Sequence, residues 1–140
     1  MLAVMPTKKV GTKKKVDLES LVAIFGKLAR GNPFVCIEDT GGHAPSAAGL
    51  RSMTYSFSSV ETLCVAFKMP YRAVLARKWQ SEFWKQPRGG KRDTKKLALI
   101  SAKKMWSNQK WLENSRCRVA HDGLVDAALI AEYGRRKYER

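Results

Sequence analysis

The chain has 140 residues, enough for one domain with a core of ordinary size. Its 27 Lys and Arg residues against 12 Asp and Glu residues give a formal net charge of +15, which predicts a polyanionic partner. No apolar run approaches the length of a transmembrane helix. Three cysteines without metal-ligand spacing argue against a disulfide framework and against structural zinc.

The first 38 residues predict a strand, a basic loop, a helix and a second strand. The short strand is expected over residues 2–5, and the basic loop that follows holds five lysines between residues 8 and 15. A helix is expected from residue 18 to 28, ending at Gly31, because apolar residues recur there at helical spacing and Asp17 can serve as its N-cap. The apolar run that begins at Phe34 ends in the carboxylates Glu38 and Asp39, and it predicts a buried strand over 34–38.

A helix and a strand come next, in the order of a βαβ unit. The helix is expected over residues 50–68, and it carries Thr54, Ser58 and Thr62 at four-residue intervals. Such small residues are expected to let the helix approach a sheet closely. The strand over 70–75 follows directly, which favours an alternating α/β architecture.

Aromatic and basic side chains are interleaved between residues 78 and 96. Trp79, Phe83 and Trp84 lie near the basic residues Lys78, Lys85, Arg88, Lys91, Arg92, Lys95 and Lys96. This mixture suits nucleic-acid contact through stacking and phosphate pairing. The alternative is that the aromatic residues belong to the core and the charges solvate a surface loop; for Trp79 and Trp84 both interpretations stay open. A helix is expected over 93–106.

Two carboxylates open the last apolar segment of the chain. Asp122 and Asp126 lie four residues apart at the start of the run 121–131, so a helix there stacks both acids on one face. Paired acids in that position suggest a cation or a basic group opposite them. The alternative is local: Asp122 caps the helix, and Asp126 lies in a first turn that the helix dipole favours.

A third carboxylate, Glu38, stands at the end of the strand predicted over 34–38. Ligand and metal sites of α/β sheets lie at the carboxyl ends of strands, so Glu38 is expected to meet Asp122 and Asp126. Three carboxylates there form a hard oxygen site suited to Mg²⁺ or Mn²⁺. An acidic pocket within a basic surface is the charge layout of a metal-dependent nuclease. The alternatives are a solvated basic face and a ribosomal-type RNA-binding protein.

Five segments, in this order and spacing, carry a resemblance to a known family. They are VCIE at 35–38, MPYRAV at 69–74, RKW at 77–79, KRDTK at 91–95 and HDGLVDAALIAEYG at 121–134. Together they resemble the RuvC-like Holliday-junction resolvases of the kind found in bacteriophages. The resemblance covers most of residues 1–134, and its last segment is the most specific.

The resemblance implies an RNase H-like fold, a homodimer and a two-metal site that cuts a four-way DNA junction. The family's strand-end glutamate falls on Glu38, and its paired acids fall on Asp122 and Asp126. His121 can help to activate water or contact the scissile phosphate, although a lone histidine is often incidental. The basic residues implied to hold the junction arms are Lys91, Arg92, Lys95 and Lys96, through phosphate contacts that position without specifying sequence.

One feature of the family is absent from the sequence. The family carries another essential aspartate on its first strand, and this chain has no acid before Asp17. The first hairpin of the fold is therefore expected to be missing, which exposes a sheet edge that another chain can cover. The missing acid is expected from Asp39, from another chain or from residues outside this sequence.

Two functions follow as expectations, for a single domain over residues 1–140 with a basic tail at 135–140. The first is a Holliday-junction resolvase, a structure-selective endonuclease that uses Mg²⁺ or Mn²⁺. The second is a catalytically inactive RuvC-like descendant that binds DNA or RNA, or assembles a ribonucleoprotein. An intracellular compartment is expected, either the cytoplasm of a bacterial or phage-infected cell or an organelle matrix, because the cysteines form no disulfide framework.

Overall fold

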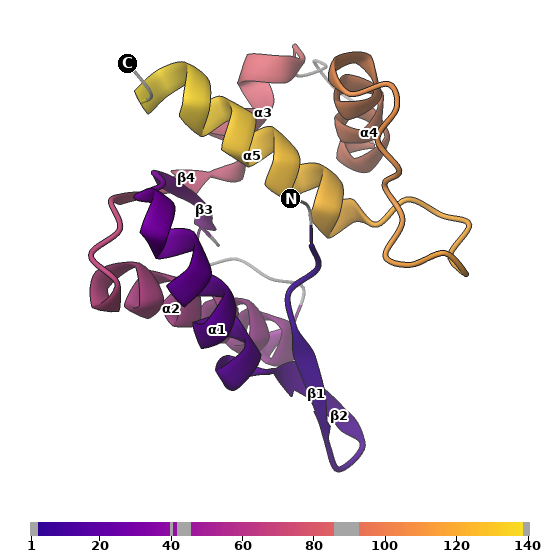
Figure 1. The fold of residues 1–140 in the computed structure, drawn as a ribbon. Helices are drawn as coiled ribbons and strands as arrows, with labels where there is room; N and C mark the ends of the chain where they lie inside the picture. The colour runs from indigo at the N-terminus through magenta and orange to yellow at the C-terminus, as the bar shows by residue number, and fades with distance from the viewer. Residues whose placement is uncertain (1–2, 40, 42–45, 86–92, 139–140) are drawn as a thin grey trace. The chain divides into compact units, whose positions relative to one another are not determined.

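The computed structural model describes residues 3–39, 41, 46–85 and 93–138. The chain forms two compact units: residues 5–75 make up most of the N-terminal unit, and residues 76–137 most of the C-terminal unit. Figure 1 labels the helices and strands of each unit. The elements are helices and strands in both parallel and antiparallel pairs, so the chain belongs to the mixed α/β class. The single domain over residues 1–140 stays a prediction.

A β-hairpin opens the N-terminal unit. β1 (Thr7–Val10) and β2 (Lys13–Val16) pair antiparallel and are joined by a two-residue loop. The first loop residue, Gly11, has a φ of 62°, a conformation that glycine adopts without strain and that two-residue hairpin loops require. Residues 3–6 form no strand, so the prediction of a strand over 2–5 followed by a basic loop is wrong for the described residues.

The predicted βαβ unit is confirmed. β3 (Val35–Asp39) and β4 (Tyr71–Leu75) pair in parallel, and α2 (Ala47–Ala66) connects them. The helix begins ahead of the predicted residue 50 because Ser46 caps it: the Ser46 Oγ accepts a hydrogen bond from the Gly49 N–H at 3.0 Å. Because β3 and β4 run parallel, Glu38 and Asp39 at the end of β3 lie at the carboxyl edge of this strand pair.

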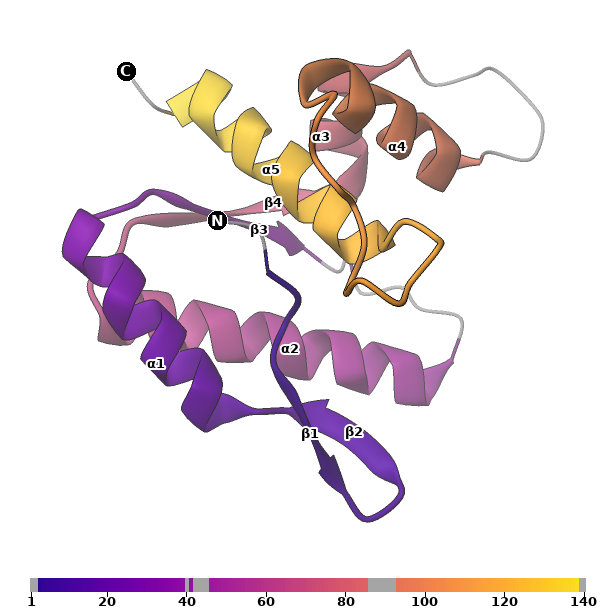
Figure 2. The same ribbon diagram turned by 45° about the vertical axis from the view of Figure 1, so that its right-hand side comes forward.

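The core of the N-terminal unit lies between the β3–β4 pair and two helices on the same side of it (Figure 2). α1 (Leu18–Leu28) continues as one 3₁₀ turn to Gly31, where the predicted helix ends. The buried core residues are Leu21, Phe25, Ile37, Cys64 and Met69. Thr54, Ser58 and Thr62 are exposed. The prediction that they face the sheet is wrong, because α2 turns its larger apolar side chains inward and so buries more apolar surface.

Within its described residues, the C-terminal unit is helical. α3 (Ala76–Phe83) was not predicted as a helix, because its mixture of basic and aromatic residues favoured a surface segment. α4 (Thr94–Met105) agrees within one residue at each end with the helix predicted over 93–106. Asp93 caps α4, because its carboxylate accepts a hydrogen bond from the Lys96 N–H at 3.1 Å.

The last helix, α5 (Asp122–Tyr138), confirms that the acidic pair lies on a helix. Its buried residues are Leu124, Val125, Leu129, Ile130, Tyr133 and Gly134. Residues 135–138, which begin the predicted basic tail 135–140, are the last residues of this helix. Basic residues extend the helix rather than fray it, because positive charge at a helix C-terminus is favoured by the helix dipole.

The strands of the described residues form two separate two-stranded sheets. The larger mixed sheet of an RNase H-like fold, and the absence of its first strand, stay predictions. Among the helices in the described ranges, none combines the length and the apolar character needed to cross a membrane.

Candidate functional site

The predicted acidic pair lies at the start of α5, in the C-terminal unit. Asp122 is the first helical residue, and Asp126 follows about one turn later on the same face. Asp122 is exposed, whereas Asp126 is half-buried. The spacing of the two acids therefore places them along one helix face, as predicted.

His121, rather than Asp122, caps the start of α5. Its Nδ1 accepts a hydrogen bond from the Leu124 N–H at 3.3 Å, and its carbonyl accepts from the same N–H at 3.0 Å. The His121 N–H in turn donates to the Trp111 carbonyl at 2.7 Å. The interpretation of Asp122 as the cap is wrong by one residue. Asp122 lies instead in the first turn, where the helix dipole favours a negative charge, and Asp126 lies beyond that turn.

A basic group lies opposite the acidic pair, as the sequence predicted. The Nζ of Lys95, on α4, is 2.5 Å from the Asp122 Oδ2. The hydrogen bond to Asp122 raises the pKa of Lys95, and the charges of Asp122, Asp126 and Asp93 raise it further. Both partners are well exposed, so solvent screens the ion pair and its main effect is to orient the two side chains.

The carboxylates of the C-terminal unit do not by themselves fit the predicted three-carboxylate metal centre. Across the parts of the chain that are described, no three His, Cys, Asp or Glu side chains form a group able to hold a metal ion. The ammonium group of Lys95 already neutralises Asp122. A divalent cation at the pair would have to displace Lys95 and gain further oxygen ligands. The Mg²⁺ or Mn²⁺ centre stays a prediction.

Glu38 lies near the carboxyl end of β3, in the N-terminal unit, as the sequence predicted. It is half-buried and borders an open hollow of about 320 Å³. Most of the lining of this hollow is apolar and comes from α2, with Met53, Phe57 and Val60 among its side chains. The acidic pair belongs to the other unit, so the meeting of Glu38 with Asp122 and Asp126 stays a prediction.

Asp39, a candidate for the missing acid, has a local partner. Its Oδ1 accepts a hydrogen bond from the Gly41 N–H at 3.0 Å, which closes a turn after β3. Successive side chains of a strand point to opposite faces, so Asp39 and Glu38 do not share one. The described geometry therefore gives Asp39 a role in the turn rather than a place beside Glu38.

Three predicted nucleic-acid-binding lysines are exposed and make no ion pair with any described residue. They are Lys78 on α3, Lys85 after that helix, and Lys96 on α4. Lys95, a fourth member of the set, is held by Asp122. The other three members, Arg88, Lys91 and Arg92, lie outside the described residues. Of the seven predicted residues, these three lysines are therefore the described ones that stay available to phosphate.

Trp79 belongs to the core of the C-terminal unit. Its exposed fraction is 1%, and its ring meets that of Trp84 edge to face at a centroid distance of 5.8 Å. A buried ring cannot stack on a base, so the core interpretation is right for Trp79. Trp84 is half-buried and packs against it.

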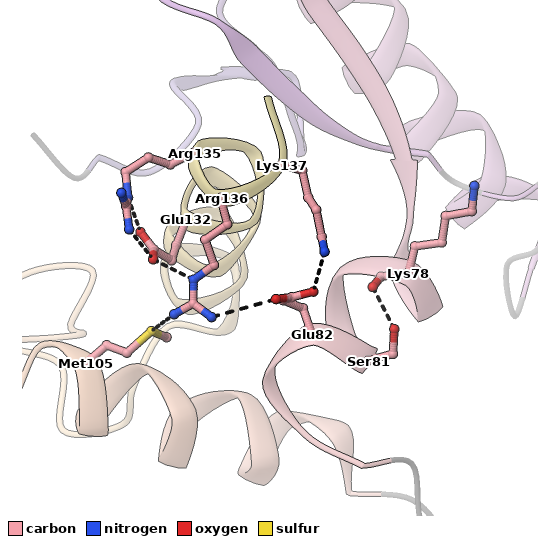
Figure 3. Close-up of polar contacts among 8 residues, drawn as sticks. All are labelled: Lys78, Ser81, Glu82, Met105, Glu132, Arg135, Arg136 and Lys137. Atoms are coloured by element: carbon pink, nitrogen blue, oxygen red, sulfur yellow. Dashed lines mark hydrogen bonds and ion pairs between the residues drawn. The ribbon is translucent and has the colours of Figure 1, made fainter. Parts of the chain in front are cut away.

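A charged cluster where α5 ends was missed by the sequence interpretation (Figure 3). Glu132 accepts hydrogen bonds from the Arg135 Nε at 2.8 Å and from the Arg136 Nε at 2.7 Å. The bonds from Arg135, ahead of those from Arg136, lower the pKa of Glu132 to about 2, although burial opposes the shift. Glu82 of α3 lies 3.0 Å from the Lys137 Nζ. The signal in the sequence was the spacing of three and four residues between Glu132 and its arginines.

The structure thus brings His121, Asp122, Asp126 and Lys95 together at the start of α5, and it places Glu38 at the end of β3. No protein-family model matches the sequence, and no curated protein matches it either. The resemblance to RuvC-like resolvases therefore depends on the five sequence segments and on the chemistry of these residues.

Proposed function

We propose that this protein binds branched nucleic acid, four-way DNA junctions above all, on an RNase H-like fold similar to that of RuvC-like resolvases. The observation that carries the proposal is a set of exposed lysines on the C-terminal unit. Lys78, Lys85 and Lys96 are exposed and have no described ion-pair partner, in a chain with a net charge of +15. Lysines in this state bind phosphates by releasing the counterions that surround nucleic acid.

The arrangement of acids supports the family part of the proposal. A parallel βαβ unit that carries Glu38 near the end of its first strand precedes a helix that begins at Asp122 and carries Asp126 four residues later. That order is the order of the segments that resemble RuvC-like resolvases. The proposal includes the homodimer that the resemblance implies, because a two-fold symmetric protein matches the symmetry of a four-way junction. It also includes another chain that covers the sheet edge left by the first strand, which is expected to be missing, and RNA as an alternative ligand.

Metal-dependent cleavage of the junction is the second candidate function. The stacking of Asp122 and Asp126 on one helix face favours it, because two carboxylates can supply oxygen ligands to Mg²⁺ or Mn²⁺. In this candidate Glu38 is the third ligand. The Nδ1 of His121 faces the Leu124 N–H, which leaves Nε2 as the ring nitrogen that would contact a phosphate or a water in this candidate.

The first experiment compares a labelled four-way DNA junction with a duplex of equal length and with single-stranded RNA, over a series of salt concentrations. The triple variant Lys78→Gln, Lys85→Gln, Lys96→Gln should weaken junction binding and reduce the slope of log K against log salt by about 2 to 3. A matched control, Lys27→Gln, Arg30→Gln, Arg51→Gln, removes the same charge from exposed positions of the N-terminal unit. Equal slopes in both variants, or equal binding of junction and duplex, would contradict the proposal.

The second experiment adds Mg²⁺ or Mn²⁺, with EDTA as the control, and measures cutting of the junction. If cleavage is the function, Glu38→Gln and Asp126→Asn should each abolish it, because loss of one ligand from such a site removes several kcal/mol of transition-state stabilisation. Both variants should still bind the junction. A parent protein that binds the junction and leaves it uncut would reduce the function to binding alone.

A further inference from the structure

The β1–β2 hairpin concentrates positive charge at residues 7–16, in a different part of the sequence from the basic residues predicted between 78 and 96. Five of its eight strand residues are lysines, and every strand residue except Val16 is exposed. The register sets Lys8 opposite Lys15 and Lys9 opposite Lys14. The two strands therefore carry like charges in directly opposed pairs, an arrangement that sequence inspection alone did not show.

This arrangement works against the stability of the hairpin. Like charges directly opposite each other in an antiparallel pair are destabilising, and a two-stranded ribbon is only marginally stable in water. Lys8 has a partner, since its Nζ lies 3.7 Å from Asp17. The other four lysines form no ion pair with any residue in the described ranges. No carboxylate of the described residues therefore offsets the repulsion among these four lysines, and their side chains are open to an anionic partner.

From this surface we infer that the β1–β2 hairpin is a second nucleic-acid-contacting element, which holds backbone phosphates of a duplex without reading its sequence. The inference rests on the proposed function and names a further surface for it. A two-stranded ribbon has the width that a DNA groove admits. Lysine ammonium groups bind phosphates as point charges, which positions a protein on the duplex without specifying bases.

The composition of the hairpin favours nucleic acid over a membrane surface. Segments that bind a bilayer interface combine basic residues with large apolar or aromatic anchors. The only exposed large apolar residue of the hairpin is Val10, with an exposed fraction of 47%. Phosphates that neutralise the opposed lysines also remove their mutual repulsion, so the bound hairpin is more stable than the free one.

The test measures binding of a labelled four-way DNA junction by the full chain over a series of salt concentrations. The variant Lys9→Gln, Lys13→Gln, Lys14→Gln should reduce the slope of log K against log salt by about 2 to 3. The control variant Lys27→Gln, Arg30→Gln, Arg51→Gln removes the same number of charges from the same unit and should leave the slope nearly unchanged. A slope equal to that of the parent in the hairpin variant would overturn the inference.

A second variant separates binding from folding. Lys9→Glu together with Lys15→Glu turns both opposed pairs into pairs of opposite charge, so the hairpin should be at least as stable as in the parent. Junction binding should nevertheless fall by tenfold or more at low salt, because four units of positive charge are lost. Unchanged affinity in this variant would also overturn the inference.

The outcomes distinguish this inference from the proposed function. Failure of the parent to bind any nucleic acid would overturn both. A parent that binds the junction, with hairpin variants that bind it equally well, would overturn the hairpin inference alone. Loss of binding to phosphatidylserine vesicles in the hairpin variants, with junction binding intact, would assign the hairpin to a membrane surface instead.

Discussion

At the start of α5, the imidazole ring of His121 lies close to Gly123. The Nδ1 of His121 bonds to the Leu124 N–H, and its ring lies against the backbone of Gly123. A Cβ at position 123 would lie 3.1 Å from the His121 Cε1 and 3.3 Å from its Nδ1. A side chain at this position therefore fits only if the His121 ring gives way by a few tenths of an ångström.

This fit predicts an energetic coupling between His121 and Gly123. Gly123→Ala alone should stabilise the protein by less than the roughly 1 kcal/mol that alanine gains over glycine in a helix, because the ring must shift and its cap bond weakens. In a His121→Ala background the same substitution should show the full gain. Chemical denaturation of the parent, both single variants and the double variant measures the coupling, expected to be about 0.5 to 1 kcal/mol. Additive effects would rule out the contact between ring and glycine.

The pairing of Lys95 with Asp122 shows what could be predicted for a single residue. The acids of the pair predicted a basic group opposite them, because paired carboxylates are unstable near an apolar face without one. Lys95 is that group, although it was predicted to bind nucleic acid. The choice of partner depends on the contact between α4 and α5, which local spacing does not determine. The His121 cap was missed because histidine is not among the usual capping residues.

At the scale of the element, the last turn of α5 is held by charge. Glu132 bonds to Arg135 and Arg136, and the Arg136 guanidinium lies 5.2 Å from the ring centroid of Phe83 on α3. The same arginine lies 3.6 Å from the Met105 Sδ on α4. The cluster therefore links the end of α5 to α3 and to α4 (Figure 3).

Removal of the Glu132 carboxylate should change how the free energy of unfolding depends on pH. The folded-state pKa of Glu132 is about 2, below its ordinary value of 4.5. Its contribution is therefore complete above about pH 4.5 and disappears as the pH falls toward 2. Glu132→Gln should cost about 1 kcal/mol at pH 7 and nothing near pH 2.

Urea unfolding of the parent and of Glu132→Gln at a series of pH values between 2 and 7 measures this difference. A matched control is Glu19→Gln, which removes an exposed carboxylate from the first turn of α1. If the difference in unfolding free energy between the parent and Glu132→Gln stays constant across this pH range, the role given to the ion pairs is contradicted.

Element boundaries were predicted well where the apolar pattern is regular. α1, β3 and α4 lie within one or two residues of their predicted limits, and Asp17 and Asp93 precede the two helices, although only Asp93 makes a side-chain cap hydrogen bond. The hairpin was missed because lysine-rich segments lack the apolar alternation that identifies a strand. Gly11, at the loop of the hairpin, was the available signal.

At the scale of the whole molecule, the sequence predicted the α/β class and the βαβ unit. Both depend on local patterns that recur in chain order. The candidate metal site was predicted from three residues in two units, and such a site depends on contacts between segments far apart in the chain. Glu38 and Asp126 are each placed on the expected element. The distance between Glu38 and Asp126 depends on how the two units are arranged, and local sequence patterns do not determine that arrangement.

The parallel pairing of β3 and β4 also bears on how the chain is made. Val35 pairs with Tyr71, 36 positions later, and α2 must lie between them. At a synthesis rate of about 5 to 20 residues per second, β3 leaves the ribosome about 2 to 7 s before its partner strand. During that interval β3 has no partner strand, whereas helix formation in α2 takes only microseconds once its residues have emerged. Between the synthesis of these two strands, the nascent chain therefore exposes an unpaired apolar strand, which is the kind of surface that aggregates and that chaperones bind.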